Sequence, residues 1–130
     1  MTRIDWTELL FSSTGRLGRT GFLGLTTLLL VLAVAFESMT GDRAPGWIGW
    51  IFYAALMFCW ACILSKRLHD RGNRGWWAFL PVWALWVAWS PPHDLAQVPP
   101  FVILAATFMY LGLVPGQRAG NRFGPSLRPA

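Results

Sequence analysis

The sequence is poor in charge. Charged residues make up 13% of its 130 residues, whereas a soluble domain usually carries about 25%. The charges that are present lie in clusters, and long stretches without any charge separate them. Apolar residues make up 55% of the chain. This distribution argues against an ordinary soluble domain and is typical of a chain that crosses a membrane.

Cysteine is also scarce. The two cysteines, Cys59 and Cys62, lie inside an apolar run. A structural zinc site normally takes four ligands, and no second pair of cysteines exists to complete one. A redox pair gains from a helix N-terminus, whereas these thiols lie near the C-terminal end of their expected helix. We predict a packing role for both thiols, with no metal and no cofactor.

Several functional motifs are missing as well. The chain has no Walker-type G-x-x-x-x-G-K-[ST] sequence and no serine in a nucleophile elbow. Its apolar runs hold no Asp, Glu, Lys or Arg in their central turns, where an ion-coupled transporter usually has one. The net charge of +5 does not predict nucleic-acid binding, because the apolar runs leave little soluble surface for a basic patch. We therefore expect no nucleic-acid partner, and we assign no catalytic residue.

Four apolar runs are the dominant positive feature. They predict an all-α fold, an integral membrane bundle of four short transmembrane helices. The bundle forms a single domain over residues 1–130, with spans at about 22–37, 47–65, 76–90 and 100–114. A straight span needs about 20 residues, so flanking residues and local thinning of the bilayer must complete the shorter runs. The third run contains Pro81, and a re-entrant or interfacial segment is its alternative.

Basic residues fall on one side of this four-span topology. They precede the first run, separate the second from the third and follow the fourth, whereas the two remaining loops hold only Arg43. Because cytoplasmic loops are enriched in Lys and Arg, we expect both termini in the cytoplasm. Residues 3–11 have an apolar and a charged face, which predicts a short helix on the membrane surface. We expect residues 125–130 to form a loose tail.

Three polar segments would then meet at the cytoplasmic end of the bundle. Residues 11–22 have the pattern F-x-x-x-G-R-x-x-R-x-x-F, residues 66–77 the pattern K-R-L-H-D-x-G-x-x-G-W-W, and residues 115–125 the pattern P-G-x-x-x-G-N-R-F-G-P. In this order, and over nearly the whole chain, they resemble the signature stretches of the bacterial inner-membrane proteins grouped as domain of unknown function 805. The resemblance implies a small multi-pass protein of the bacterial inner membrane, and it implies no activity.

Two interpretations of these segments stay open. In the first, Asp70 pairs with Arg16 or Arg19 and locks the helix ends together, since an unpaired carboxylate at the bilayer edge is costly. In the second, the arginines converge on an anion such as a lipid phosphate or a nucleotide, which the guanidinium fork suits well. The cluster residues are Arg16, Arg19, Arg67, His69, Asp70, Asn121 and Arg122, with Gly15, Gly72, Gly75, Gly120 and Gly124 as hinges and Trp76 and Trp77 as interface aromatics.

The leading functional prediction is a non-enzymatic binding or assembly module whose cytoplasmic cluster binds anionic lipid or a partner protein. Its expected partners are the lipid bilayer, anionic lipids and further copies of the chain, because small residues such as Ala54, Ala61 and Ala105 let helices approach closely. An oligomeric channel or transporter component is the second hypothesis. The third is a membrane enzyme that acts on a lipid headgroup or a nucleotide through His69 and Asp70.

Overall fold

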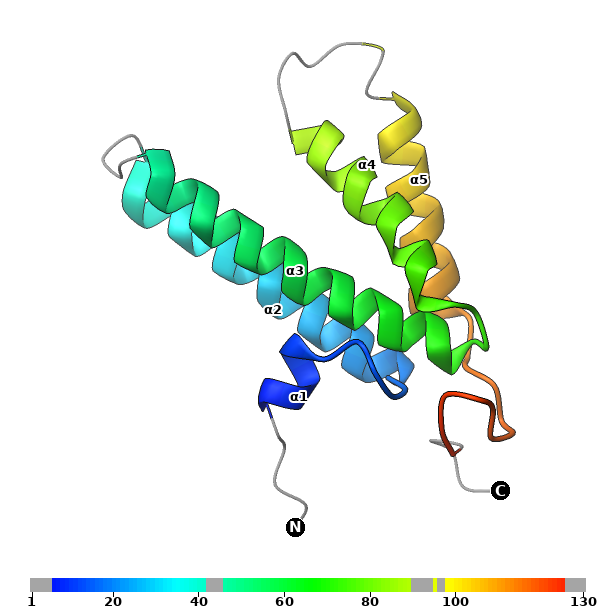
Figure 1. Cartoon of the computed structure of the whole chain (residues 1–130). Coiled ribbons are helices and arrows are strands. Elements are labelled where there is room, and N and C mark those ends of the chain that lie inside the picture. The colour runs from blue at the N-terminus through cyan, green and yellow to red at the C-terminus, as the bar shows by residue number, and fades with distance from the viewer. Residues whose placement is uncertain (1–5, 42–45, 90–94, 96–97, 126–130) are drawn as a thin grey trace.

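A long helical hairpin forms one half of the molecule. In this computed structural model, α2 (Arg19–Thr40) and α3 (Gly46–Asp70) run antiparallel and side by side (Figure 1). The elements that the structure describes are helical, as the sequence predicted. The described residues are 6–41, 46–89, 95 and 98–125.

A shorter hairpin forms the other half. It begins with a 3₁₀ turn, η2 (Gly75–Ala78), which continues directly into α4 (Phe79–Trp89). The second helix of this hairpin is α5 (Val98–Phe108), which continues into a π-helical turn, η4 (Met109–Leu113). Figure 1 shows that the two hairpins meet at one end and diverge from there. The helices therefore pair two by two along their lengths, and a closed four-helix bundle is not confirmed.

The end of α3 is fixed by the residue that follows it. Gly72 has a φ of 76°, a left-handed conformation that costs glycine little. Its N–H donates to the His69 carbonyl at 3.0 Å, and the Asn73 N–H donates to the Leu68 carbonyl at 2.9 Å. This pair of bonds is a Schellman motif. It stops α3 just after Asp70 and turns the chain towards the second hairpin.

The four predicted spans coincide with helices, but not all are equally long. α2 and α3 are long and apolar enough to cross a bilayer, and 22% and 33% of their most apolar windows are buried. A core helix of a soluble protein would be mostly buried instead. The helical segment 98–113 is apolar but shorter, and α4 has 11 residues. Two candidate spans are therefore established by length and composition, and the four-span topology stays a prediction.

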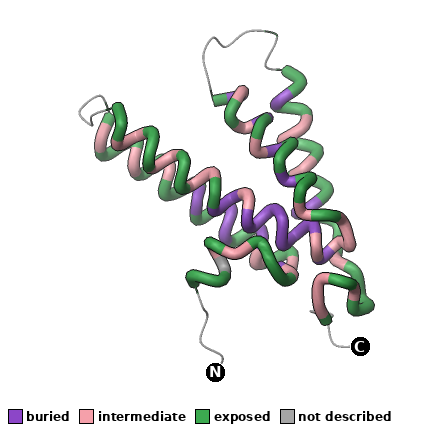
Figure 2. Tube along the Cα trace, viewed as in Figure 1, coloured by how far each residue is buried: buried purple, intermediate pink, exposed green. Residues whose placement is uncertain are grey.

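The buried core lies where the hairpins meet. Figure 2 shows buried positions concentrated along the second half of α3 and the neighbouring elements, whereas the diverging ends are mostly exposed or intermediate. The largest fully buried apolar side chains are Phe22, Ile63, Leu64 and Leu111. Arg67 is fully buried with them. A charged side chain in this core needs partners, and these define the candidate site.

The predicted N-terminal helix is present over the part of its range that the structure describes. α1 spans Trp6–Phe11 and packs on α3, with the rings of Phe11 and Phe58 centred 6.4 Å apart. Residues 3–5 of the predicted segment lie outside the described residues, as do Arg43 and most of the predicted tail, 126–130. In Figure 1, α1 lies beneath the second half of the long hairpin, and the loop after η4 lies at the end where the hairpins meet.

Candidate functional site

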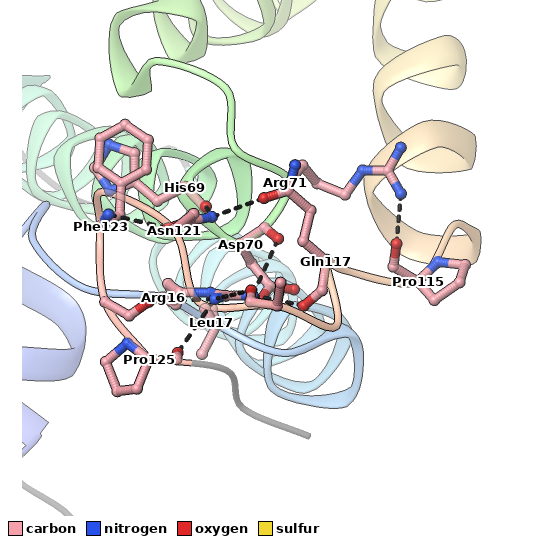
Figure 3. Close-up of polar contacts among 12 residues, drawn as sticks. Arg16, Leu17, His69, Asp70, Arg71, Pro115, Gln117, Asn121, Phe123 and Pro125 are labelled. Carbon is pink, nitrogen blue, oxygen red and sulfur yellow. Dashed lines mark hydrogen bonds and ion pairs between the residues drawn. The ribbon is translucent and has the colours of Figure 1, made fainter. Parts of the chain in front are cut away.

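Asp70 is the centre of the polar contacts that join the three motif segments (Figure 3). Its Oδ1 accepts hydrogen bonds from Arg16 Nε at 3.1 Å and from Arg16 Nη2 at 2.9 Å. Its Oδ2 accepts one from Arg67 Nη1. The side chains of Arg16, Arg67 and Asp70 are 2%, 0% and 5% exposed. We call these three residues the Asp70 cluster. Of the two partners proposed from the sequence, Arg16 is the one that contacts Asp70.

Arg67 ties the end of α3 to the end of the second hairpin. Its Nε donates to the Leu111 carbonyl at 2.8 Å, and its Nη2 donates to the Val114 carbonyl at 2.7 Å. Its Nη1 also reaches the Leu17 carbonyl at 3.4 Å. The π-helical turn η4 supplies the Leu111 carbonyl, since a local change of helical pitch frees carbonyls from the regular ladder. Arg67 thus supplies hydrogen-bond donors to carbonyl groups that have no backbone partner at the end of this helix.

Arg16 holds the loop of residues 115–125 in the same way. Its Nη2 donates to the Gln117 carbonyl at 2.8 Å. Its Nη1 donates to the carbonyls of Ala119 at 3.1 Å, Gly124 at 3.3 Å and Pro125 at 3.2 Å. Each guanidinium nitrogen of Arg16 and Arg67 therefore donates to the protein itself. The N–H groups of these two arginines therefore bind Asp70 and backbone carbonyls of neighbouring segments and do not face an open pocket.

His69 and Asn121 form a second layer of contacts between the segments. The His69 ring stacks on Phe123, with centroids 3.9 Å apart and 7° between the planes, and its Nδ1 lies 3.2 Å from the Gly15 carbonyl. Asn121 Nδ2 donates to the His69 carbonyl at 2.9 Å. His69 lies beyond the apolar run that ends at Ser65. Burial lowers the pKa of His69, and the charge of Arg122 lowers this pKa further, whereas the hydrogen bond to the Gly15 carbonyl raises it. The neutral imidazole, with Nδ1–H as donor, fits this environment.

Some residues of the site were not among the sequence candidates. Arg71 Nη1 donates to the Pro115 carbonyl, and its guanidinium lies 4.4 Å from the centre of the Tyr110 ring. Gln117 N–H donates to the Asp70 carbonyl at 2.9 Å. Lys66, which is buried, donates to the Glu8 carbonyl. All but Tyr110 and Glu8 belong to the motif segments, so the motif pattern was the signal that could have found them.

The predicted hinge glycines divide into two groups. Gly15, Gly72 and Gly124 have positive φ angles of 88°, 76° and 143°, whereas neither Gly75 nor Gly120 has one. Gly75 is needed for close packing instead, because an added Cβ would lie 2.0 Å from Ser65 Oγ. Gly116 is a stronger case, because its Cβ would lie 1.8 Å from Asp70 Oδ2. The backbone at Gly116 thus covers the Asp70 carboxylate.

The remaining predicted residues lie on the surface of this end. Arg19 is exposed and reaches the Leu113 carbonyl at 3.4 Å, and the exposed Arg122 lies over the Phe123 ring at 4.7 Å. The rings of Trp76 and Trp77 stack at 4.5 Å and are 62% and 51% exposed, as interface aromatics would be. Within the described ranges no group of His, Cys, Asp and Glu has metal-site geometry, and Cys59 and Cys62 are buried free thiols.

Comparison with known proteins gives relatives without a known activity. The family model described as "Protein of unknown function (DUF805)" matches residues 10–125. The chain is 29% identical to "Uncharacterized protein YiiR" of Escherichia coli strain K12, over 95% of this chain and 89% of that protein. The protein of the same name from Escherichia coli O157:H7 matches to the same extent. No solved structure matches significantly. The matched range contains all three motif segments.

Proposed function

The chain belongs to the DUF805 family of proteins of unknown function, and we propose that it is a four-span inner-membrane protein whose cytoplasmic end binds anionic lipid headgroups. It acts in this proposal as a non-enzymatic binding or assembly module. The apolar, largely exposed surfaces of both hairpins support the membrane location. The distribution of basic residues supports the orientation.

The division of the arginines carries the lipid part of the proposal. Arg16 and Arg67 are buried and satisfied by Asp70 and backbone carbonyls. Exposed arginines surround them on the same end of the molecule: Arg19, Arg74, Arg118 and Arg122. The carboxylate of Asp70 is already paired with the two buried guanidiniums, so it does not neutralise these exposed arginines. We call these four exposed arginines the basic face.

A basic face next to the bilayer attracts anionic headgroups. Each Lys or Arg near such a surface contributes about 1 kcal/mol, so three of them change an apparent affinity by about 100-fold. The Asp70 cluster has a separate task in this account. It holds the loop of residues 115–125 against α3, and this keeps Arg118 and Arg122 at the cytoplasmic end of the molecule.

The test is lipid binding by the purified chain in uncharged maltoside micelles. Phosphatidylglycerol and a zwitterionic lipid with the same acyl chains are titrated in, and bound lipid is counted by native mass spectrometry. We expect the triple variant R19Q/R118Q/R122Q to lose most of its phosphatidylglycerol and none of its zwitterionic lipid. The matched triple variant with Lys at these positions keeps the charge and should retain binding. Equal phosphatidylglycerol binding by the Gln variant and the wild type would refute the proposal.

A further inference from the structure

A cavity lies between the two hairpins, away from the Asp70 cluster. Its volume is about 430 Å³, within the usual range for small-molecule sites. Residues of α2, α3, α4 and α5 line it, and its walls are apolar apart from isolated hydroxyl and indole groups. The wall residues of α2 are Thr26, Leu29, Leu30 and Ala33, which follow one face of that helix.

Aromatic rings from both hairpins gather on this cavity. Trp50 of α3 and Trp86 of α4 have ring centroids 5.5 Å apart. Tyr53 of α3 and Trp89 of α4 have centroids 5.9 Å apart. All four line the cavity, and we call them the aromatic wall. Interfacial tryptophans of membrane proteins face the headgroups, whereas these rings meet across the gap between two hairpins.

A carboxylate adjoins the aromatic wall. Glu37 is one helical turn beyond Ala33 on the cavity-lining face of α2, and the Tyr53 hydroxyl donates a hydrogen bond to its Oε2. The described residues place no other charged side chain at this end of the helices. The faces of aromatic rings carry negative electrostatic potential and attract cations. The aromatic wall and the Glu37 carboxylate therefore both favour a positively charged ligand.

We propose that this cavity binds an amphiphilic organic cation. The apolar body of the ligand packs between the hairpins, and its ammonium or phosphonium centre lies against the aromatic wall with Glu37 as the counter-charge. Apolar walls select against small hydrated cations such as Na⁺, and the carboxylate selects against anions of the same shape. The site lies at the end opposite the basic face, so either proposal can fail without the other.

Two probes of the same shape and opposite charge test the proposal. Tetraphenylphosphonium and tetraphenylborate, both radiolabelled, are equilibrated with the full chain in uncharged maltoside micelles, with empty micelles as the blank. We expect saturable binding of one tetraphenylphosphonium per chain and no saturable binding of tetraphenylborate. Equal binding of the two ions, or partitioning no greater than into empty micelles, would overturn the assignment.

Substitutions then locate the site. Glu37→Gln should weaken tetraphenylphosphonium binding by about tenfold or more, and Trp86→Leu should have a comparable effect. Glu37→Asp keeps the charge and should retain most of the affinity, which separates loss of charge from loss of fold. Glu8→Gln and Trp76→Leu make the same chemical changes at the opposite end and should leave binding unchanged. Wild-type affinity in Glu37→Gln would contradict the proposal.

A final arm distinguishes a free organic cation from a lipid amine. A short-chain phosphatidylethanolamine, added below its micellar concentration, presents an ammonium group that is linked to a phosphate. We expect it to leave bound tetraphenylphosphonium in place, because Glu37 repels the phosphate. Displacement at comparable concentrations would assign the cavity to a lipid headgroup and overturn the proposal of a free cation.

Discussion

Replacing Asp70 with Asn tests whether the Asp70 cluster holds the fold together. The substitution keeps the shape of the side chain but removes the charge that two buried guanidiniums share. Removing one partner of a buried ion pair costs about 3–5 kcal/mol, because the other charge is left uncompensated. Arg16 and Arg67 keep their bonds to backbone carbonyls in the variant. We therefore expect a loss near the lower limit, about 3 kcal/mol.

The assay is thermal unfolding of the purified protein in maltoside micelles, followed by circular dichroism. For a chain of this length each kcal/mol shifts Tm by roughly 3–5 °C, so Asp70→Asn should lower Tm by about 10 °C. Arg74→Gln is the control, since it neutralises an exposed charge at the same end, and it should change stability by no more than about 0.5 kcal/mol. If the two variants unfolded at the same temperature, Asp70 would not lock the helix ends.

Three further predictions follow from the same geometry. Gly116→Ala should destabilise the chain by about 1–3 kcal/mol, because its Cβ would lie 1.8 Å from Asp70 Oδ2. Gly24→Ala is the control, because it lies inside α2 with no atom near the added Cβ, and it should not destabilise the chain in the same melts. In the Asp70→Asn background, Arg16→Gln should cost at least about 0.5 kcal/mol less than in the wild type, and strict additivity of the two changes would count against their coupling. The pKa of His69 is lowered in the folded state, so the contribution of His69 to stability is complete above about pH 6.5 and is lost as the pH falls below that value. The free energy of unfolding should therefore depend less on pH in His69→Gln than in the wild type. Identical pH profiles of the two proteins would refute this.

The sequence was a good guide to where the helices lie. Long apolar runs without charge have few alternatives to a helix, because an apolar environment requires each backbone group to find its partner within the segment. It was a weaker guide to their ends. The run that ends at Ser65 predicted the end of α3 too early, since the helix continues through Lys66 and Arg67 to Asp70. Buried hydrogen bonds to other segments offset the polarity of this last turn.

The candidate site was predictable as a set of segments, but its contacts were not. Charge alone could not choose between Arg16 and Arg19 as the partner of Asp70, because both lie at the start of α2, Arg16 just before it and Arg19 as its first residue. The choice depends on the path of a loop that is about a hundred residues away in sequence, whose carbonyls surround Arg16. The role of Gly116 likewise depends on how closely that loop approaches α3. Hydrophobic periodicity could not predict the cavity either, since it does not specify which helices pair.

Thiol labelling of single cysteines tests most directly the central claim that the three motif segments share the cytoplasmic end of four spans. In a background in which Cys59 and Cys62 are replaced by Ser, a cysteine is placed in turn at Thr14, Asn73 and Arg118, and in the segments 42–45 and 90–94. A membrane-impermeant maleimide is then applied to intact cells and to inverted membrane vesicles. The account predicts that the first three positions react only in inverted vesicles and that the two segments react only in intact cells. Labelling of Arg118→Cys in intact cells, with Asn73→Cys reactive only in inverted vesicles, would contradict it.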